Sequence, residues 1–552
     1  MISKLSIVQY RKLKSLDLNF CPGVNIISGT NGTCKSSILH MISNAYKRAK
    51  QSANPRMLDG ACVRTIARVN AGMNCKIESL VRGDKKYRDP ALGVVGTLFT
   101  INYENGMALN FRRHRSEQDF RFAVKPNYAP GTHEKLPEMP VIYLGLPRLL
   151  PRGELADDVA TRRVGKQLPT DYSNELAALY KRLTRMEMGA KHAVSNVASL
   201  KCCEEFETTV PGVDSNTISS GEDNVLCILR AIVSLRYYYE KLANKTGLTE
   251  SVLLIDELDA TLHPSLQIEL CELLRKYAAD YKIQVICTTH SLTLLEDVLT
   301  KGDNVIYFID DLDHISVLPD PDIFKIRMHL KNCTRRDLYE GRKIPVFAED
   351  DEARAVLGVL LDHIFSRGSG IEHLRTHFHF VRSFIGAANL ETIFKDGCLS
   401  VKSTSFAVLD GDKNQDVANN LIVLPGVNKS PEQFLFEYGK MLCHGGADTF
   451  WHSPVATNNG YSRTYFNRIE SDWEDMERKI RDLHASGRSA EGVRRAETKA
   501  IWSRYEPFFI ELMKFWVADS SNQRAVSNFI AGLKIMFKKT AAANGINPRD
   551  WS

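Results

Sequence analysis

The sequence lacks several features that mark secreted, membrane-bound or zinc-binding proteins. Its twelve cysteines include no Cys-x-x-Cys pair and show no regular spacing, which argues against a disulfide framework and a zinc ribbon. No apolar run reaches the roughly 18 residues that a membrane helix needs, and the amino terminus has no signal-peptide pattern. We therefore expect a cytoplasmic protein with reduced thiols and no membrane partner.

A strong excess of one charge, internal repeats and a set of zinc ligands are also lacking. The formal net charge is only +6 and the isoelectric point is near 8.6, which permits nucleic-acid binding without indicating it. No H-N-H arrangement is present, so an HNH nuclease would have to be a separate subunit. The chain does have length, because 552 residues suffice for two or three domains with sizeable cores.

The most specific motif is a glycine-rich run between an apolar stretch, Val24–Ile27, and a helical pattern, Ile38–Ile42. Strand, turn and helix in this order are typical of a phosphate-binding P-loop. Backbone N–H groups of the turn and the start of the helix attract phosphate. Lys35 can reach the β- and γ-phosphates of ATP, and Ser36 can ligate Mg²⁺. The predicted ATP-binding residues are Gly29, Thr30, Asn31, Gly32, Thr33, Cys34, Lys35, Ser36 and Ser37, with Cys34 in place of the usual glycine.

Two further apolar strands end in residues suited to ATP hydrolysis. Val252–Ile255 is followed by Asp256 and Glu257, and Val285–Thr289 is followed by His290. Because ligands bind at the carboxyl ends of parallel strands, Asp256 is predicted to hold Mg²⁺ through water and Glu257 to polarise the attacking water. His290 is predicted to contact the γ-phosphate or that water, and the alternative is a structural histidine at a strand end.

A third motif, Ile218–Asn224, opens an apolar helix and contains Ser219, Ser220, Gly221 and Glu222. Serine and glycine at a helix start form an anion site. The motif resembles the signature of ABC-type ATPases, in the branch of the RecF, SMC and OLD (overcoming lysogenisation defect) proteins. The resemblance implies that two chains pair head to head, so that each signature completes the ATP site of the other chain. No glutamine between the P-loop and the signature is assigned to a Q-loop.

The second half of the chain carries a separate acidic pattern. The strand Ile344–Ala348 ends at Glu349, and about sixty residues later Phe406–Leu409 is followed by Asp410 and Asp412. Residues two apart lie on the same side of a strand, so Glu349, Asp410 and Asp412 are predicted to form a Mg²⁺ site of hard oxygen ligands. Such a site can stabilise displacement at phosphorus. The two motifs resemble a Toprim domain, which implies metal-dependent nuclease chemistry with Mg²⁺ or Mn²⁺.

The resemblance to a Toprim domain departs from the pattern at one position. The first motif usually has an aspartate four residues after the glutamate, where this sequence has Ala353, and Glu352 is the nearby residue that could substitute. Two alternatives therefore stay open: an active nuclease, and a Toprim fold kept as a scaffold.

The predicted fold class is α/β, with three parts. Residues 1–325 form an ABC-type ATPase domain of the RecF and SMC kind, with short strands at about 56–132 and an inserted helical arm at about 150–210. Residues 340–440 form a Toprim-like domain, and 441–552 form a helical region. Aromatic residues of this last region indicate a bundle core or, alternatively, a surface that stacks bases. They are Trp473, Trp502, Tyr505, Phe508, Phe509, Phe515 and Trp516.

An ABC-type ATPase followed by a Toprim domain resembles the OLD family over roughly residues 1–440. The resemblance implies a homodimer or higher oligomer that binds nucleic acid in bacterial anti-phage defence. One alternative is an OLD nuclease, alone or as a retron effector with a reverse transcriptase and its RNA–DNA hybrid. The other is an ATPase like PtuA of Septu systems, which restrains a partner HNH nuclease, PtuB. A RecF- or SMC-like repair ATPase without nuclease activity is the third interpretation.

Overall fold

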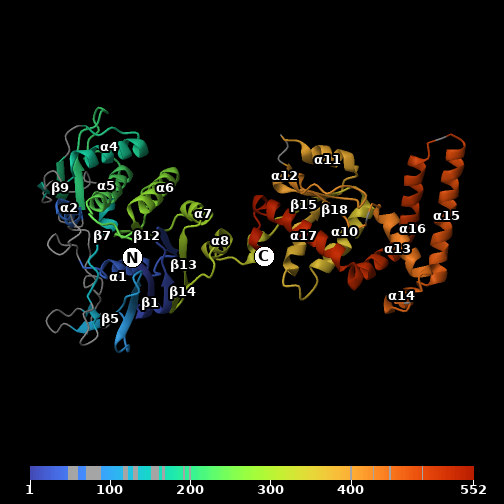
Figure 1. Ribbon diagram of the computed structural model, residues 1–552, viewed down its shortest axis with the longest axis horizontal. Coiled ribbons are helices and arrows are strands. Elements are labelled where there is room, and N and C mark those ends of the chain that lie inside the picture. The colour runs from blue at the N-terminus through green and yellow to red at the C-terminus, as the bar shows by residue number, and fades with distance from the viewer. Residues whose placement is uncertain are drawn as a thin grey trace. The chain divides into compact units, whose positions relative to one another are not determined.

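The computed structural model divides the chain into two compact units, Met1–Asn332 and Cys333–Ser552, which are described separately (Figure 1). The structure describes residues 1–47, 60–69, 89–115, 122–128, 135–150, 161–163, 168–189, 193–197, 201–397, 401–426, 428–446, 449–487 and 489–551. Within these ranges, no helix combines the length and the apolar character needed to cross a bilayer.

The first unit is built on a six-stranded sheet whose central strands lead into the predicted ATP site. The strand order is β14-β13-β3-β12-β11-β7, and all neighbours run parallel except β13 and β14. The carboxyl ends of β3, β11 and β12 therefore meet at one edge of the sheet. The strands are β3 (Val24–Gly29), β7 (Val141–Leu144), β11 (Ser251–Ile255), β12 (Ile283–Thr289), β13 (Asn304–Asp311) and β14 (His314–Val317).

Alternate residues of these strands face two different cores. In β11, Leu253 and Ile255 join one core, whereas Val252 and Leu254 join the other, as a strand buried on both faces requires. The first core is covered by the helices α2 (Ala61–Val69), α4 (Thr170–Thr184), α5 (Ser220–Glu240), α6 (Pro264–Tyr281), α7 (Leu292–Lys301) and α8 (Ile323–Lys331).

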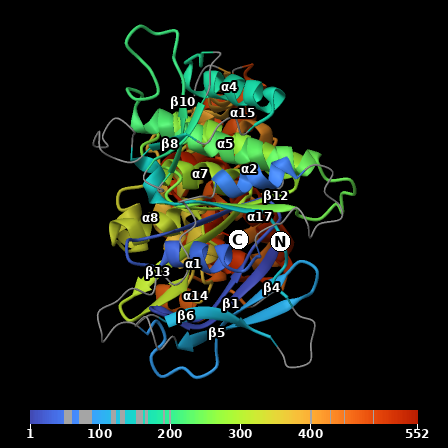
Figure 2. The ribbon, with the colours of Figure 1, turned by 90° about the vertical axis from the view of Figure 1, so that its left-hand side faces the viewer.

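The second core lies between the six-stranded sheet, helix α1 (Lys35–Ser43) and a five-stranded antiparallel sheet. This second sheet has the order β2-β1-β4-β5-β6 and lies on the opposite side of the unit from α4 and α5 (Figure 2). Its strands are β1 (Ile2–Tyr10), β2 (Leu13–Asn19), β4 (Thr97–Tyr103), β5 (Ala108–Arg115) and β6 (Phe122–Asn127).

Two stretches of the first unit differ from their predicted structure. The region of predicted strands at about 56–132 also contains helix α2, because Cys62, Val63 and Ile66 form a buried face at helical spacing. In its described residues, the predicted helical arm holds one helix, α4, and a small antiparallel sheet of β8 (Thr161–Arg163), β9 (Ala193–Val197) and β10 (Lys201–Glu205). β9 and β10 pair as neighbouring antiparallel strands and β8 adds to the other edge of β9, which satisfies backbone hydrogen bonds within the sheet.

The second unit begins with a parallel sheet of order β16-β15-β17-β18. Because β15 and β17 are neighbours, the residues that follow them come together at one edge. The elements are α9 (Arg335–Tyr339), β15 (Ile344–Ala348), α10 (Asp351–Ile364), β16 (Phe378–Phe380), α11 (Ala387–Lys395), α12 (Val401–Thr404), β17 (Phe406–Leu409) and β18 (Leu421–Val423).

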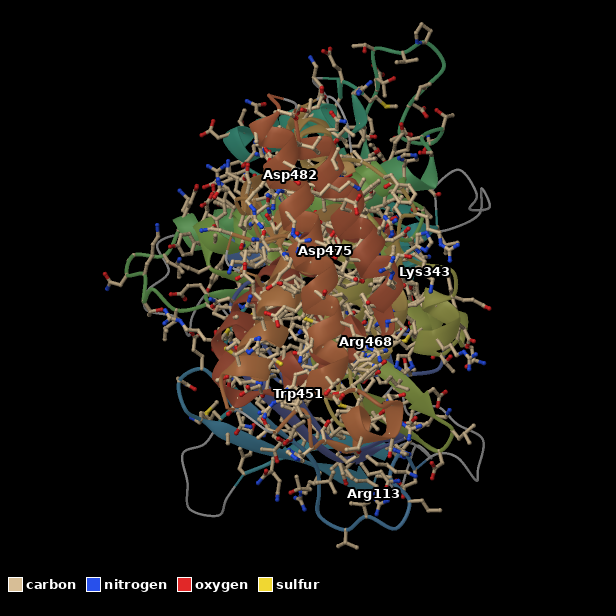
Figure 3. The ribbon with its side chains drawn as sticks, turned by 90° about the vertical axis from the view of Figure 1, so that its right-hand side faces the viewer. Arg113, Lys343, Trp451, Arg468, Asp475 and Asp482 are labelled. Carbon is tan, nitrogen blue, oxygen red and sulfur yellow. The ribbon has the colours of Figure 1, made fainter. Side chains whose placement is uncertain are left out.

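The remainder of the second unit is helical. It contains α13 (Pro431–His444), α14 (Pro454–Asn459), α15 (Arg463–Ala485), α16 (Glu491–Ala518) and α17 (Gln523–Thr540). Helices α15 and α16 lie side by side, and Figure 3 labels Arg468, Asp475 and Asp482 along α15. Trp502, Phe508, Phe509 and Trp516 are buried, as a bundle core requires, whereas Trp473 is only half-buried.

Candidate functional site

The P-loop turn of the first unit depends on two glycines. β3 ends at Gly29 and α1 begins at Lys35. Gly29 has a φ of +145°, and a Cβ there would lie 2.6 Å from the carbonyl oxygen of Phe308 on β13. Gly32 has a φ of +83° in open space. Glycine is therefore required at the first position by space and conformation, and at the second by conformation alone.

Lys35 is buried and folds back onto its own loop. Its Nζ donates hydrogen bonds to the carbonyl oxygens of Gly29 and Thr30, each at 3.0 Å, and Thr33 Oγ1 donates to the same Thr30 carbonyl at 2.8 Å. Burial lowers the pKa of Lys35, and the carboxylates after β11 oppose this shift. The ammonium group thus lies among acceptors that phosphate oxygens could replace. Among the other predicted members, Asn31 is exposed, Ser36 half-buried and Ser37 buried.

Cys34 stands where a P-loop usually has glycine, and its backbone shows the reason for that preference. Its φ of +62° lies in the left-handed region, which costs a residue with a Cβ roughly 1–2 kcal/mol. Its side chain does not cap α1, and burial raises the pKa of its thiol. The sequence therefore keeps the P-loop turn at the cost of local strain.

Asp256 and Glu257 follow β11 and are fixed by one residue of the neighbouring strand. Thr288 Oγ1 donates a 2.7 Å hydrogen bond to Oδ1 of the buried Asp256. Thr288 Oγ1 also accepts a hydrogen bond from the backbone N–H of Glu257, at 2.7 Å. Glu257 has a φ of +53°, a left-handed conformation that this contact stabilises.

Glu257 faces His290, the residue that follows β12. Its Oε1 lies 3.4 Å from His290 Nε2. Burial raises the pKa of Glu257, His290 opposes that shift, and the neighbouring Asp256 and Asp259 add to it. A carboxyl group with a raised pKa is a better proton acceptor near neutral pH. Asp259 also positions His290, because its Oδ1 accepts Thr289 Oγ1 at 2.6 Å and the His290 N–H at 3.2 Å.

Sequence reasoning missed Arg148, which is fully buried in the short 3₁₀ helix after β7. Its Nε donates to Asn224 Oδ1 on α5 at 2.8 Å, and Nη2 donates to the carbonyl oxygen of Glu257 at 2.8 Å. Nη1 donates to the carbonyl oxygens of Leu144 and Gly145. One guanidinium thus joins the signature helix to the backbone of Glu257. A single arginine after a short strand gives no sequence signal of such a link.

The predicted signature forms the start of α5. Ser219 Oγ accepts the Glu222 N–H at 3.2 Å, and Glu222 Oε2 accepts the Ser219 N–H at 2.8 Å, which is a capping box. A Cβ on Gly221 would lie 2.6 Å from the carbonyl oxygen of Thr261, so only glycine fits there. In the described residues, no hydrogen bond joins Ser219–Glu222 to the P-loop of the same chain.

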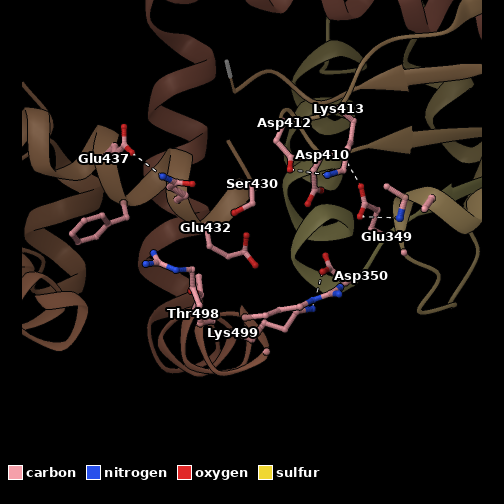
Figure 4. A pocket seen from close by; sticks show the side chains of 18 of the residues that line it. Glu349, Asp350, Asp410, Asp412, Lys413, Ser430, Glu432, Glu437, Thr498 and Lys499 are labelled. Carbon is pink, nitrogen blue, oxygen red and sulfur yellow. Dashed lines mark hydrogen bonds and ion pairs between the residues drawn. The ribbon is translucent and has the colours of Figure 1, made fainter. Parts of the chain in front are cut away.

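The acids predicted as metal ligands meet in the second unit (Figure 4). Glu349 Oε1 accepts the backbone N–H of Asp410 at 3.1 Å, and its Oε2 accepts that of Ala387 at 3.2 Å. Asp410 Oδ1 is buried and has no hydrogen-bond partner among the described residues. Burial, with the nearby carboxylates, raises the pKa of Asp410 to about 9. Asp412 is more exposed and accepts Lys413 Nζ at 2.8 Å.

A second group of carboxylates lies beside the first. Oxygen atoms of Asp350, Glu352 and Glu432 lie within 4.8 Å of one another, and all three residues are buried. Lys499 of α16 donates to Asp350 at 2.7 Å and to Glu352 at 3.2 Å. Ala353, where the Toprim pattern has aspartate, is buried, and its N–H donates to Asp350 Oδ1 at 3.1 Å. Glu352 and Glu432, rather than residue 353, therefore accompany Asp350.

Most of these acids line one cavity of about 1030 Å³. Hard carboxylate oxygens are the ligands that Mg²⁺ and Mn²⁺ prefer. The cavity lining holds eight carboxylates and four cations, and Asp410 Oδ1 has no hydrogen-bond partner among the described residues. The residues therefore fit one or more divalent cations.

Comparison with known proteins bears on the first unit. Residues 213–296 match a family model described as AAA domain, putative AbiEii toxin, Type IV TA system; they contain the signature, Asp256, Glu257 and His290. No curated protein matches the sequence. Fold and site together define the first unit as a P-loop ATPase domain.

Solved structures of two kinds of ATPase head are similar to the chain. The SMC head domain from Thermotoga maritima is 14% identical, with 58% of this chain and 99% of that chain covered and a TM-score of 0.31. The recombination mediator protein RecF of the RecFOR pathway is 12% identical, with 58% and 98% covered and a TM-score of 0.32. At these scores the likeness defines no activity.

Proposed function

We propose that the chain is an ATP-hydrolysing ABC-type ATPase that controls metal-dependent cleavage of nucleic acid. One observation carries the proposal: the same chain combines a P-loop site with a cavity in which buried carboxylates converge and acids outnumber the lining cations. Nucleotide sites of this kind work as switches, and clustered carboxylates hold the cations that promote displacement at phosphorus.

In the proposed ATPase reaction, Lys35 holds the β- and γ-phosphates, while Ser36 and Asp256 hold Mg²⁺ directly or through water. Bound Mg²⁺ would neutralise charge on the phosphate oxygens. Glu257 polarises the attacking water, and its raised pKa suits it to accept a proton. His290, 3.4 Å from Glu257, orients that carboxylate or contacts the γ-phosphate.

A second copy of the chain would complete the ATP site. The start of α5 attracts phosphate through the backbone N–H groups of Ser220 and Gly221. Its side chains bond within their own turn rather than to the P-loop of the same chain. These contacts favour a homodimer that closes on ATP, with a higher oligomer as an extension of it.

In the proposed cleavage reaction, the acids form two ligand groups. Bound Mg²⁺ or Mn²⁺ would supply a Lewis acid and an activated water. Glu349 is pre-positioned by its two backbone hydrogen bonds, and Lys499 offsets the negative charge of the second group. The first group is Glu349, Asp410 and Asp412, and the second is Asp350, Glu352 and Glu432.

We propose that bound ATP inhibits the cleavage of nucleic acid. In anti-phage defence of the OLD kind, a fall in ATP or a phage-made signal would open the dimer and release the nuclease. A retron setting would add a reverse transcriptase and its RNA–DNA hybrid as partners.

One observation favours a second candidate, a PtuA-like regulator of a separate HNH nuclease, PtuB. Ala353 replaces a usual acid, and Lys499 already neutralises Asp350 and Glu352 through two ion pairs. A carboxylate group satisfied by a lysine can serve as a scaffold. A RecF- or SMC-like repair ATPase shares the first unit but leaves the acidic cavity without a role.

The deciding experiment uses the purified chain alone with DNA and RNA, in Mg²⁺ or Mn²⁺, beside an Asp410→Ala/Asp412→Ala variant. Cleavage that is lost in the variant supports the nuclease. ATP hydrolysis without cleavage in either protein would reject it and favour a regulator of a separate subunit. Metal-induced thermal stabilisation, compared between the two proteins, reports cation binding independently of cleavage.

A further inference from the structure

The acidic cavity extends beyond its carboxylates to a pair of stacked aromatic rings. Phe436 of α13 and Trp473 of α15 both line it. Their ring centroids are 4.0 Å apart and their planes differ by only 5°. Phe436 is buried and also stacks on Phe466, at 5.9 Å. One face of the Trp473 indole is therefore held by a rigid aromatic backing.

Trp473 differs from the other tryptophans of the chain. Five are present, and Trp451, Trp502, Trp516 and Trp551 are each at most 7% exposed, whereas Trp473 is half-buried. Within the described residues, Phe436 is the one ring that packs on it. A fixed indole with a second face available at a cavity wall is the geometry on which bases stack.

Phe436 lies one helical turn from Glu432 on α13, and Arg495 lies one turn from Lys499 on α16. Glu432 and Phe436 are four residues apart, as are Arg495 and Lys499, and all four line the cavity. Residues at this spacing share one helix face, about 6 Å apart along the axis. This spacing suits a phosphate bound at the carboxylates and the base of the adjacent nucleotide bound at the aromatic ring.

One cation of this wall, Arg495, is available to a phosphate. Arg495 is exposed and has no hydrogen bond or ion pair among the described residues, whereas the adjacent Arg494 is paired with Glu477. A neighbouring cavity of about 450 Å³ shares Phe436 and Trp473 and is further lined by equal numbers of cations and acids. Its cations are Lys440, Arg478 and Arg481, and its acids are Glu437, Glu474 and Glu477.

We propose that Trp473, backed by Phe436 and flanked by Arg495, is a stacking subsite for an unpaired nucleotide beside the scissile phosphate. This inference rests on the proposed nuclease function and narrows its substrate to single-stranded nucleic acid or to unpaired positions within a duplex. A base inside a duplex is already stacked and paired on both sides, so it does not reach the indole without being unstacked.

Binding by the full chain, measured in EDTA without nucleotide, tests the subsite apart from cleavage. The probes are labelled oligothymidylate, an abasic oligomer of the same length and a blunt duplex, followed by fluorescence anisotropy. Trp473→Ala should weaken oligothymidylate binding by about tenfold and abasic binding far less, because stacking on one aromatic ring contributes on this scale. Arg495→Gln should weaken both single strands alike and reduce the salt dependence.

Two further measurements make the test specific. Trp473→Phe should keep most of the affinity, and Phe384→Ala, an exposed ring of the same unit outside the cavity, should keep all of it. Oligothymidylate should quench the fluorescence of the wild type but not of Trp473→Ala. Equal binding of duplex and single strand, or equal losses on thymidine and abasic probes, would overturn the subsite.

The outcomes separate the two proposals. Trp473-dependent stacking without cleavage in Mg²⁺ or Mn²⁺ supports the subsite and rejects the nuclease. Metal-dependent cleavage with affinity unchanged in Trp473→Ala rejects the subsite and leaves the nuclease standing.

Discussion

The two candidate sites both lie at the carboxyl ends of parallel strands, but they differ in whether their charged side chains have hydrogen-bond partners. In the first unit, Lys35 bonds to carbonyl oxygens of its own loop, and Asp256 bonds to Thr288. In the second unit, Asp410 Oδ1 has no hydrogen-bond partner among the described residues, and the pKa of this carboxyl group is raised to about 9.

The two sites should therefore respond differently to their ligands. The first site keeps its backbone geometry through internal hydrogen bonds, so nucleotide binding has little to reorganise. The second site concentrates negative charge at low solvent access, so a cation should change its stability and its protonation together. Variants of the first site should change ATP turnover, and variants of the second should change cation binding.

Replacing Glu257 with glutamine should have the largest effect. The amide keeps the shape of the side chain but cannot accept a proton, so ATP turnover should fall by about 10²- to 10⁴-fold while ATP binding persists. Steady-state hydrolysis and binding of a labelled nucleotide measure the two quantities separately. The control is Glu269→Gln, an exposed residue of α6. Turnover near that of the wild type would remove Glu257 from the reaction.

Asp410→Asn should disable the second site and spare the first. The loss of one anionic ligand should abolish the thermal stabilisation by Mn²⁺ and lower any metal-dependent cleavage by on the order of 100-fold. ATP hydrolysis by the same protein serves as an internal control, and Asp362→Asn, an exposed partner of Arg375, is the matched variant. Unchanged stabilisation by Mn²⁺ would show that the cation binds elsewhere.

Acid should destabilise the first unit through His40 on α1. Burial lowers the pKa of His40 from 6.5 to about 4, and its Nε2 lies 2.7 Å from the hydroxyl of Tyr143. The unfolded chain binds a proton at His40 more readily than the folded chain does. The contribution of neutral His40 to the free energy of unfolding is therefore complete above pH 6.5 and is lost as the pH falls toward 4, by up to about 3 kcal/mol. Thermal unfolding across this range should depend less on pH in His40→Phe, but not in His314→Gln, an exposed control.

Arg148→Lys tests whether Arg148, which is far from Glu257 in the sequence, holds that residue in position. Lysine keeps the charge but not the fork that reaches both Asn224 and Glu257. We expect the kcat for ATP to fall by about tenfold with little change in KM, because the substitution moves Glu257 and not the P-loop. Arg182→Lys on the exposed face of α4 is the control. A rise in KM alone would point to nucleotide binding instead.

The sequence allowed the local parts of both sites to be predicted, because each is a strand followed at once by its polar residues. Gly29 to Lys35, Asp256 with Glu257, and Asp410 all obey this rule. Local pattern also explains the failure at residues 61–69, where short apolar spacing was assigned to strands although its burial follows helix α2.

Long-range partners could not be predicted in the same way. Arg148 reaches a residue 76 positions away on α5 and another 109 positions away after β11. Lys499 meets Asp350 across 149 positions. No spacing rule connects such pairs, because they depend on how helices pack over the strand ends. Trp473 likewise belonged to a general aromatic pattern, and only packing separates it from the buried core.

Cys34 carries local strain that is visible in one dihedral angle. At its φ of +62°, glycine relieves the left-handed strain but loses more backbone entropy on folding, whereas valine adds a β-branch at a forbidden position. Cys34→Gly should therefore be as stable as the wild type or more so, and Cys34→Val should be less stable than Cys34→Gly by about 2 kcal/mol. Thermal unfolding with and without ATP measures this order, and ATP turnover shows whether the strain serves the reaction.

Equal stability of the glycine and valine variants would mean that the turn is not left-handed in solution. If Cys34→Gly hydrolyses ATP faster than the wild type, the first site tolerates the strain at Cys34 without needing it for the reaction. If Cys34→Gly is slower than the wild type, the thiol takes part in holding the loop.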